Sequence, residues 1–222
     1  MVGRANRSIG QKAAQTNYYA PRQAEAIGLP FTHMVTINFA STNIDPRLAI
    51  EAFARLRTNH FAKWARRPRK GCGPAFAPTW SYAFENSRGG VPFTTMDPGD
   101  PHNLHVHWCL HIPPTRVHDF TLKIWEWVET ITGGITGAAE AIDIQSDRNN
   151  HGYLIKAASE GIVEIYGRGV KARDEGVVIG LRADSSRNIG PTRRRERDRA
   201  EGIKRQMPVR RPKQHVGAAL GS

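Results

Sequence analysis

The chain has 222 residues, 39% of them hydrophobic, which suffices for one domain with a packed core. No apolar run reaches the roughly 18 residues that a membrane span needs, and the basic, polar first residues lack the apolar stretch of a secretory signal. A formal net charge of +12 favours a polyanionic partner, most often nucleic acid. The two cysteines, Cys72 and Cys109, are too few for a disulfide framework. We therefore expect a cytoplasmic protein without a membrane partner.

The first predicted elements follow a weakly patterned start. Residues 1–30 carry few apolar residues and no regular period, which predicts a poorly ordered N-terminal arm. THMVTINFA (32–40) alternates apolar and other residues and predicts a strand. Asp45 and Pro46 then supply an N-cap and a first-turn proline, so we expect a helix over 46–65.

The remaining elements are read from periodicity and from their flanking Gly and Pro residues. In chain order they are a strand at 79–85, a long loop at 86–103, a strand at 103–113, a helix at 115–132, a strand at 139–146 and a helix at 149–161. The order β-α-β-β-α-β predicts an α+β fold of the ferredoxin-like or RRM-like kind, with one antiparallel sheet, helices on one face and an open second face. This domain should span 31–184, and a flexible basic tail should follow over 185–222.

The strand NLHVHWCLHIP (103–113) carries histidines at alternate positions. Side chains alternate between the two faces of a strand, so Leu104, Val106, Trp108, Leu110 and Ile112 should face the core, whereas His105, His107, Cys109 and His111 should lie on the open face. His105 and His107 are then about 7 Å apart along the strand, near enough for both imidazoles to bind one ion.

A carboxylate on the neighbouring strand supplies a third ligand. Glu85 ends the strand at 79–85 on its polar side, and antiparallel pairing brings it beside His105. Two imidazoles and a carboxylate, with open positions, suit Mg²⁺ or Mn²⁺ acting on a phosphate. Alternatives stay open: a zinc site that includes Cys109, His102 and His111 as the working pair, or ordinary surface histidines.

The segment Tyr153-Leu154-Ile155-Lys156 could supply a nucleophile. In a helix, Tyr153 and Lys156 share one face. A tyrosine hydroxyl with its ordinary pKa near 10 is a poor nucleophile, but a nearby ammonium stabilises the phenolate and the charge that develops on a phosphate. The alternative is a core tyrosine beside a lysine that extends to solvent.

Taken in order, these segments resemble the motifs of the HUH endonuclease superfamily, in particular the rolling-circle replication initiators of plasmids and small phages. THMVTINF resembles their first motif, LHVHWCLHIP the second, with His105-Val106-His107 as the H-U-H, and YLIK the third. The resemblance covers about residues 32–160 and implies that His105, His107 and Glu85 bind the metal. It also implies that Tyr153 is the nucleophile and that Lys156 assists it.

The resemblance implies an activity. A tyrosine would nick single-stranded DNA at a phosphodiester, leaving a free 3′-hydroxyl and a 5′-phosphotyrosine link that can be rejoined, and so would initiate rolling-circle replication of a plasmid or phage-like element. No second tyrosine lies near Tyr153, which implies a single-tyrosine enzyme. The chain has no G-x-x-x-x-G-K-[ST] motif, so a helicase of the bacterial host would have to unwind the origin.

Other functions remain as alternatives. A single-tyrosine transposase or a relaxase would belong to the same superfamily, although relaxases place their tyrosine near the N-terminus, where this chain has Tyr18 and Tyr19. A non-catalytic RRM-like module would bind single strands through exposed aromatic residues. A metal-dependent phosphoesterase would use the histidines as acid and base without a covalent step.

Several residues are expected to bind the single-stranded or hairpin DNA of a replication origin. Polar residues of the first strand lie on the open face, and two basic segments could bind phosphates without reading sequence. These candidates are Thr36, Asn38, Lys63, Arg66, Arg67, Arg69, Lys70, Arg193, Arg194 and Arg195. The alternative for each basic residue is a charge that is simply solvated.

Overall fold

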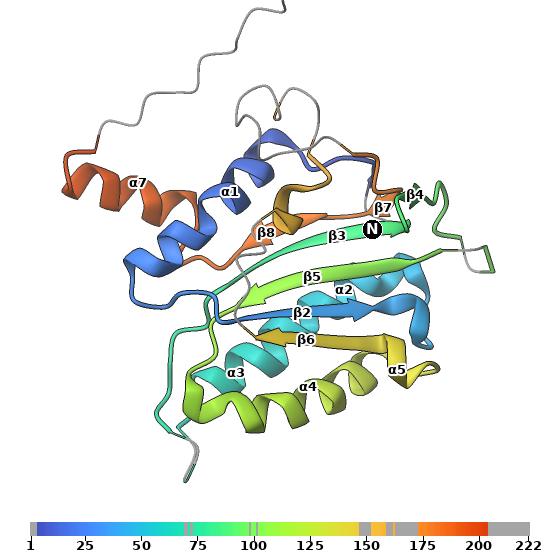
Figure 1. Cartoon of the computed structure of the whole chain (residues 1–222), viewed down its shortest axis with the longest axis horizontal. Helices are drawn as coiled ribbons and strands as arrows, with labels where there is room; N and C mark the ends of the chain where they lie inside the picture. Colours follow the sequence, from blue (N-terminus) through green and yellow to red (C-terminus); the bar gives the residue numbers. More distant parts are fainter. Residues whose placement is uncertain are drawn as a thin grey trace, which may run out of the picture.

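The computed structural model describes residues 4–68, 71, 73–97, 99–100, 102–146, 152–158, 162 and 173–203 (Figure 1). The strands are β1 (Ala5–Asn6), β2 (His33–Asn38), β3 (Trp80–Arg88), β4 (Val91–Pro92), β5 (Leu104–Leu110), β6 (Ile142–Ser146), β7 (Val178–Ile179) and β8 (Ala183–Ser185). The longer helices are α1 (Gln11–Ala26), α2 (Ala49–Arg55), α4 (Val117–Thr132) and α7 (Pro191–Ala200), and the short ones are α3 (Ala62–Ala65) and α5 (Ala138–Ala141). Tighter 3₁₀ turns are η1 (Phe39–Ser41), η2 (Pro46–Leu48), η4 (Pro114–Arg116) and η5 (Tyr153–Ile155), and η3 (Leu56–Phe61) is a π-helical stretch.

The main sheet is antiparallel and confirms the expected α+β fold. Its order is β4-β3-β5-β2-β6, and β8 pairs with β3. Strand β5 lies between β2 and β3, and β2 lies between β5 and β6, so each β-α-β unit is split by a strand of the other. This is the ferredoxin-like arrangement predicted from the order of the elements.

One face of the sheet forms the main core, which α2, α3 and α4 cover. The alternation predicted for β5 is confirmed, because Leu104, Val106 and Trp108 are fully buried on this face. The rings of Phe53 and Phe61 pack edge-on against Trp108, with centroids 5.4 and 5.0 Å away. Aromatic pairs in this geometry add to the stabilisation from buried area alone.

The helix expected over 46–65 exists, but it is composite. The Asp45 carboxylate accepts a hydrogen bond from the Arg47 amide at 2.9 Å, which confirms the predicted cap, and Pro46 follows it. The π-helical stretch η3 interrupts the regular helix between α2 and α3. Its wider turn brings Leu56 and Phe61, five residues apart, into the core together.

Helices cover part of the second face as well, which corrects the expectation of one helical layer. The predicted N-terminal arm is wrong for residues 11–26, which form α1 and pack against β3 and β8 (Figure 1). This helix buries Ala14, Ala20 and Ala24 rather than large apolar residues. Small side chains let it lie close to its neighbours while leaving little hydrophobic signal in the sequence.

The segment predicted as a tail begins inside the fold. The expected boundary at residue 185 falls in β8, and α7 then packs along α1. The Arg194 guanidinium lies 4.4 Å from the Tyr19 ring, and Arg197 donates to the Gln23 side chain at 2.6 Å. Residues 204–222 of the predicted tail lie outside the described residues. None of the described helices combines the length and apolar character needed to cross a membrane.

Candidate metal centre

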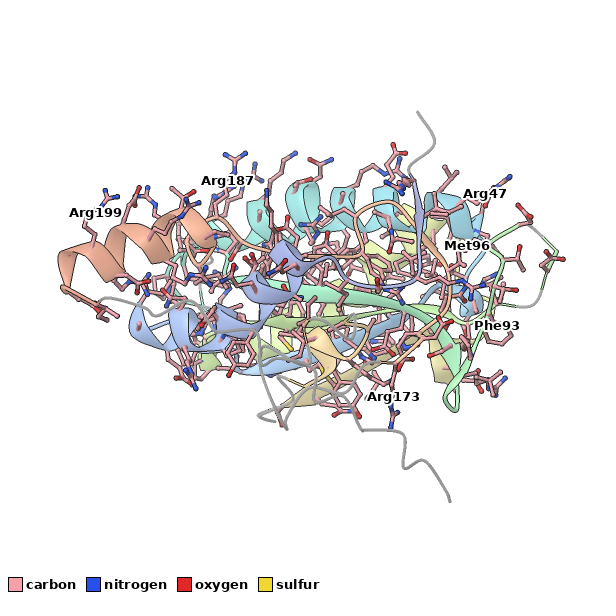
Figure 2. The ribbon with its side chains drawn as sticks, turned by 90° about the horizontal axis from the view of Figure 1, so that it is seen from above. Arg47, Phe93, Met96, Arg173, Arg187 and Arg199 are labelled. Atoms are coloured by element: carbon pink, nitrogen blue, oxygen red, sulfur yellow. The ribbon has the colours of Figure 1, made fainter. Side chains whose placement is uncertain are left out.

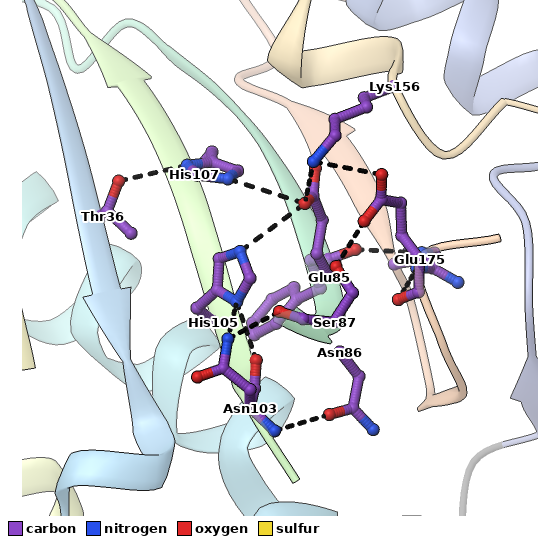
Figure 3. A network of polar contacts seen from close by, with 11 residues as sticks. Thr36, Glu85, Asn86, Ser87, Asn103, His105, His107, Lys156 and Glu175 are labelled. Carbon is purple, nitrogen blue, oxygen red and sulfur yellow. Dashed lines mark hydrogen bonds and ion pairs between the residues drawn. The ribbon is translucent and has the colours of Figure 1, made fainter. Parts of the chain in front are cut away.

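The sheet register brings Glu85 and the two histidines of the H-x-H pair together, as predicted from strand parity. Glu85 on β3 is the direct cross-strand partner of His105 on β5. Glu85 Oε2 lies 3.5 Å from His105 Nε2 and 3.8 Å from His107 Nε2 (Figure 3). We call these three residues the Glu-His-His cluster.

The other ring nitrogen of each histidine has its own partner. His105 Nδ1 donates to the Asn103 carbonyl at 2.7 Å, and His107 Nδ1 lies 3.1 Å from the Thr36 hydroxyl (Figure 3). A carbonyl oxygen only accepts, so Nδ1 of His105 carries a proton, and Nε2 is the ring nitrogen that faces Glu85. Such outer partners fix the tautomer and orientation of metal-binding histidines.

Burial of the cluster affects the pKa values of its members. Glu85 is 1% exposed and His107 is 7% exposed. Burial opposes the charge of Glu85, but hydrogen bonds from His105 and His107 outweigh it and hold the pKa of the carboxyl below its ordinary value. Burial also lowers the pKa of His107, although Glu85 partly offsets this. A carboxylate beside a neutral imidazole is the ionisation state in which both bind a metal ion.

The cluster fits a divalent metal ion. One ligand atom from each residue lies within 4.8 Å of the others. Glu85 Oε1 is buried and has no hydrogen-bond partner among the described residues, so it has an unused acceptor. Two imidazole nitrogens and a carboxylate oxygen are a common donor set, and we conclude that these residues could bind a metal ion.

The alternative ligand sets do not assemble. Cys109 is buried between Met34 and Leu154, where burial raises the pKa of its thiol to about 12. His111 lies 2.8 Å from the Pro30 carbonyl, and its ring packs against Phe76. Neither residue joins the Glu-His-His cluster. His102 is also outside it.

The tyrosine lies beside the cluster, on a shorter element than predicted. The described part of the expected helix, residues 152–158, contains only the 3₁₀ turn η5 (Tyr153–Ile155), and residues 149–151 and 159–161 lie outside the described part. Leu154 and Ile155 are buried, whereas Tyr153 is 40% exposed. The Tyr153 ring centroid lies 4.9 Å from that of His107. In a 3₁₀ turn residues i and i+3 stack, and Lys156 Nζ is 5.8 Å from the Tyr153 ring.

Helix α1 fixes this turn, a role that the sequence did not reveal. The buried Asn17 side chain donates to the carbonyls of Leu154 and Tyr82, both at 2.9 Å. Its own oxygen accepts from the Ser81 hydroxyl at 2.9 Å. One amide thus joins α1, β3 and the tyrosine turn.

Lys156 links the cluster to a second acidic residue that sequence reasoning missed. Its Nζ lies 3.0 Å from both Glu85 Oε2 and Glu175 Oε1 (Figure 3). Burial opposes the charge of Lys156, but the two carboxylates outweigh it and raise its pKa above the ordinary value. Glu175 is fully buried and precedes β8, and no local pattern marks it because only the fold brings it to the site.

The two polar residues of β2 that were predicted to bind DNA have hydrogen-bond partners within the protein. Thr36 lies opposite His107 and bonds its ring, so it belongs to the cluster's surroundings. The Asn38 carbonyl oxygen Oδ1 accepts from the Ala40 amide at 3.1 Å and caps η1.

The predicted basic residues lie away from the cluster. Lys63, Arg66 and Arg67 are exposed at α3, which covers the core face of the sheet, so they lie on the opposite side from the cluster. Arg69 and Lys70 lie outside the described residues. Arg193 pairs with Glu196 at 2.7 Å and Arg195 is exposed, but Arg194 is buried against Tyr19 and is not presented to a polyanion.

Figure 2 shows the labelled arginines on both sides of the molecule. Arg47, at the start of the helical layer, and Arg187 point to one side, whereas Arg173 points to the other. Arg173 is exposed and lies two residues before Glu175 in the chain.

Comparison of the chain with protein-family models, with curated proteins and with solved structures finds no match.

Proposed function

We propose that this protein is a metal-dependent enzyme that nicks and rejoins single-stranded DNA through a 5′-phosphotyrosine intermediate and so initiates rolling-circle replication. The observation that carries the proposal is the position of Tyr153, which is partly exposed with its ring 4.9 Å from that of His107 in the Glu-His-His cluster. A nucleophile, a cation and a candidate metal centre therefore share one face of the sheet. These are the parts that transfer of a phosphoryl group to a phenol requires.

Tyr153 would act as the nucleophile. Its phenolic oxygen would form a bond to the phosphorus of the scissile phosphodiester, and the bond from phosphorus to the 3′-oxygen would break. The phenol would lose its proton and the leaving 3′-oxygen would gain one. Attack by that 3′-hydroxyl on the phosphotyrosine reverses the step and rejoins the strand.

The surrounding residues would prepare this reaction. Glu85, His105 and His107 would hold Mg²⁺ or Mn²⁺, which would polarise the scissile phosphate and stabilise its negative charge. Lys156 brings an ammonium to the same face, where it would favour the phenolate of Tyr153 and the charge that develops on phosphate oxygens. Asn17 holds the turn that presents Tyr153.

The structure favours this proposal over a binding module. The large aromatic residues of the central strands, among them Tyr82, Phe84 and Trp108, are buried in the core and are not offered to bases. The tyrosines expected of a relaxase, Tyr18 and Tyr19, lie on α1 and pack against each other with centroids 5.1 Å apart. We expect single-stranded or hairpin origin DNA to be the substrate, with unwinding by a separate helicase.

A covalent-adduct assay tests the proposal. The full chain is incubated with Mn²⁺ and labelled single-stranded oligonucleotides, both a randomised pool and hairpins taken from DNA that flanks the coding region. We expect a denaturant-resistant protein–DNA adduct that Tyr153→Phe abolishes without loss of DNA binding. Tyr18→Phe is the matched control and should form the adduct normally.

Other outcomes identify the alternatives. Cleavage without an adduct, unchanged by Tyr153→Phe, would mean that the protein is a phosphoesterase. An adduct that Tyr18→Phe abolishes would support a relaxase. Binding without cleavage of any substrate would support a binding module, and His107→Ala should remove cleavage under either enzymatic function.

A further inference from the structure

The Lys156 ammonium contacts a carboxylate oxygen of Glu85, a residue that a metal ion in the cluster would also contact. Its Nζ is 3.0 Å from Glu85 Oε2, the same oxygen that His105 Nε2 and His107 Nε2 approach at 3.5 and 3.8 Å. An ammonium and a divalent cation repel each other at such short range. A metal ion bound through Glu85 Oε2 would therefore displace Lys156 from this contact.

Glu175 offers Lys156 a second place to bind. Its Oε1 lies 3.0 Å from Nζ, so the ammonium already bridges the two carboxylates (Figure 3). Lys156 can lose Glu85 and keep Glu175 without a large movement of its side chain. This would keep the ammonium near Tyr153, whose ring centroid is 5.8 Å from Nζ.

Contacts other than the one with Lys156 fix Glu175. The Ser87 hydroxyl donates to its other carboxylate oxygen, Oε2. Its main-chain carbonyl accepts from the Asn86 amide at 2.7 Å and from Arg182 Nη2 at 2.8 Å. The side chain is fully buried, so the carboxylate stays in place when Lys156 shifts.

We propose that Glu175 is a positioning residue that holds the Lys156 ammonium beside Tyr153 when a divalent cation takes Glu85. The inference rests on the metal centre of the proposed function. Without Glu175, Lys156 would have Glu85 as its remaining carboxylate partner in the cluster and would compete with the ion for it. A purely structural Glu175 would instead affect metal binding equally whether or not Lys156 is present.

Mn²⁺ binding measured on the full chain tests this inference. Free Mn²⁺ is followed by electron paramagnetic resonance for the wild type, Lys156→Met, Glu175→Gln and the double variant. Lys156→Met should bind Mn²⁺ more tightly, because the competing ammonium is gone. Glu175→Gln should bind it less tightly, and its loss should be about tenfold larger with Lys156 present than in the Lys156→Met background.

Controls separate this role from a general change of charge. Glu196→Gln removes one carboxylate on α7, where Glu196 pairs with Arg193, and should leave Mn²⁺ affinity unchanged. Equal losses from Glu175→Gln in the two backgrounds, or no gain from Lys156→Met, would overturn the inference. Should Glu175→Gln fail to fold, Glu175→Asp keeps the charge but shortens its reach, and the same larger loss with Lys156 present is expected.

The adduct assay keeps this inference distinct from the proposed function. If Mn²⁺ binds with the expected dependence on Lys156 but no DNA adduct forms, the role of Glu175 stands and the nicking activity does not. If the wild type binds no Mn²⁺, both fail.

Discussion

Thr36 shows how one hydroxyl can orient a histidine of the candidate metal centre. It lies directly across from His107 in the sheet, and the two side chains bond at 3.1 Å. Thr36→Val keeps the shape and removes this bond, so the His107 ring should lose its fixed orientation. We expect Mn²⁺ affinity to fall by about 10–100-fold, measured by titration at neutral pH.

A matched threonine controls for this change. Thr121 on α4 is exposed, and its hydroxyl donates to the Val117 carbonyl at 3.0 Å. Thr121→Val should bind Mn²⁺ as the wild type does. Equal affinities of Thr36→Val and the wild type would mean that His107 does not depend on this hydroxyl.

His33 should make the fold sensitive to acid. It is 8% exposed, and burial, with His111 nearby, lowers its pKa below the ordinary 6.5. Between the two pKa values the unfolded chain binds a proton that the folded chain does not, so the free energy of unfolding falls as the pH drops through that interval and is unaffected above it. Thermal melts at pH 8 to pH 5 should show a smaller loss for His33→Gln than for the wild type. Parallel losses would contradict this account.

The three members of the Glu-His-His cluster were predictable from the sequence, whereas Glu175 beside it was not. Strand parity alone placed His105, His107 and Glu85 on one face, because a strand repeats every two residues. Glu175 lies 88 residues from its partner Ser87 in the chain, and no short pattern encodes that contact.

At the scale of the element, helix α1 and the residues before it hold the short turn η5 in place. A single 3₁₀ turn has few hydrogen bonds of its own and needs outside support to hold Tyr153. Asn17 supplies it through the Leu154 carbonyl, and Ile9 adds an amide bond to the Ala157 carbonyl at 2.8 Å. The position of Tyr153 therefore depends on a helix more than 130 residues earlier in the chain, since the Asn17–Leu154 separation is 137.

Asn17→Ala should lower both the stability of the fold and the yield of the proposed adduct. The change leaves two carbonyls and the Ser81 hydroxyl without their buried partner, which costs about 1–3 kcal/mol of unfolding free energy. We expect urea denaturation to show this loss and the adduct yield to fall, because Tyr153 is no longer held. Glu25→Ala, at an exposed position of the same helix, should change neither quantity. A normal adduct yield in Asn17→Ala would show that α1 does not support the turn.

Periodicity predicted the elements that bury large residues and missed those that bury small ones. Strands β2, β3, β5 and β6 and the helices beside them carry strong apolar patterns, and the structure confirms them. Helix α1 packs through alanines, and β8 has three residues and gains its stability from pairing with β3. Neither feature has a strong local signal, since both depend on contacts made in the folded molecule.

At the scale of the whole molecule, the Glu-His-His cluster and one of the predicted basic segments lie on different faces of the sheet. The Glu-His-His cluster occupies one face of the sheet, whereas Lys63, Arg66 and Arg67 extend from the helical layer on the other. A short single-stranded oligonucleotide bound at Tyr153 cannot reach both faces of the sheet at once. Arg173, which lies near Glu175 and points away from the side of Arg47, is better placed to contact such a strand (Figure 2).

This arrangement predicts which cations govern binding of a short oligonucleotide. Arg173→Gln should weaken binding of a single strand that spans only the site, and should reduce the slope of log K against log salt by about 0.7 if one phosphate contact is lost. The triple variant Lys63→Gln, Arg66→Gln, Arg67→Gln should keep both the affinity and the slope, although it removes three charges. Fluorescence anisotropy over a series of salt concentrations measures both. If the triple variant loses more affinity than Arg173→Gln, the DNA lies on the helical face, and Tyr153 cannot be its nucleophile.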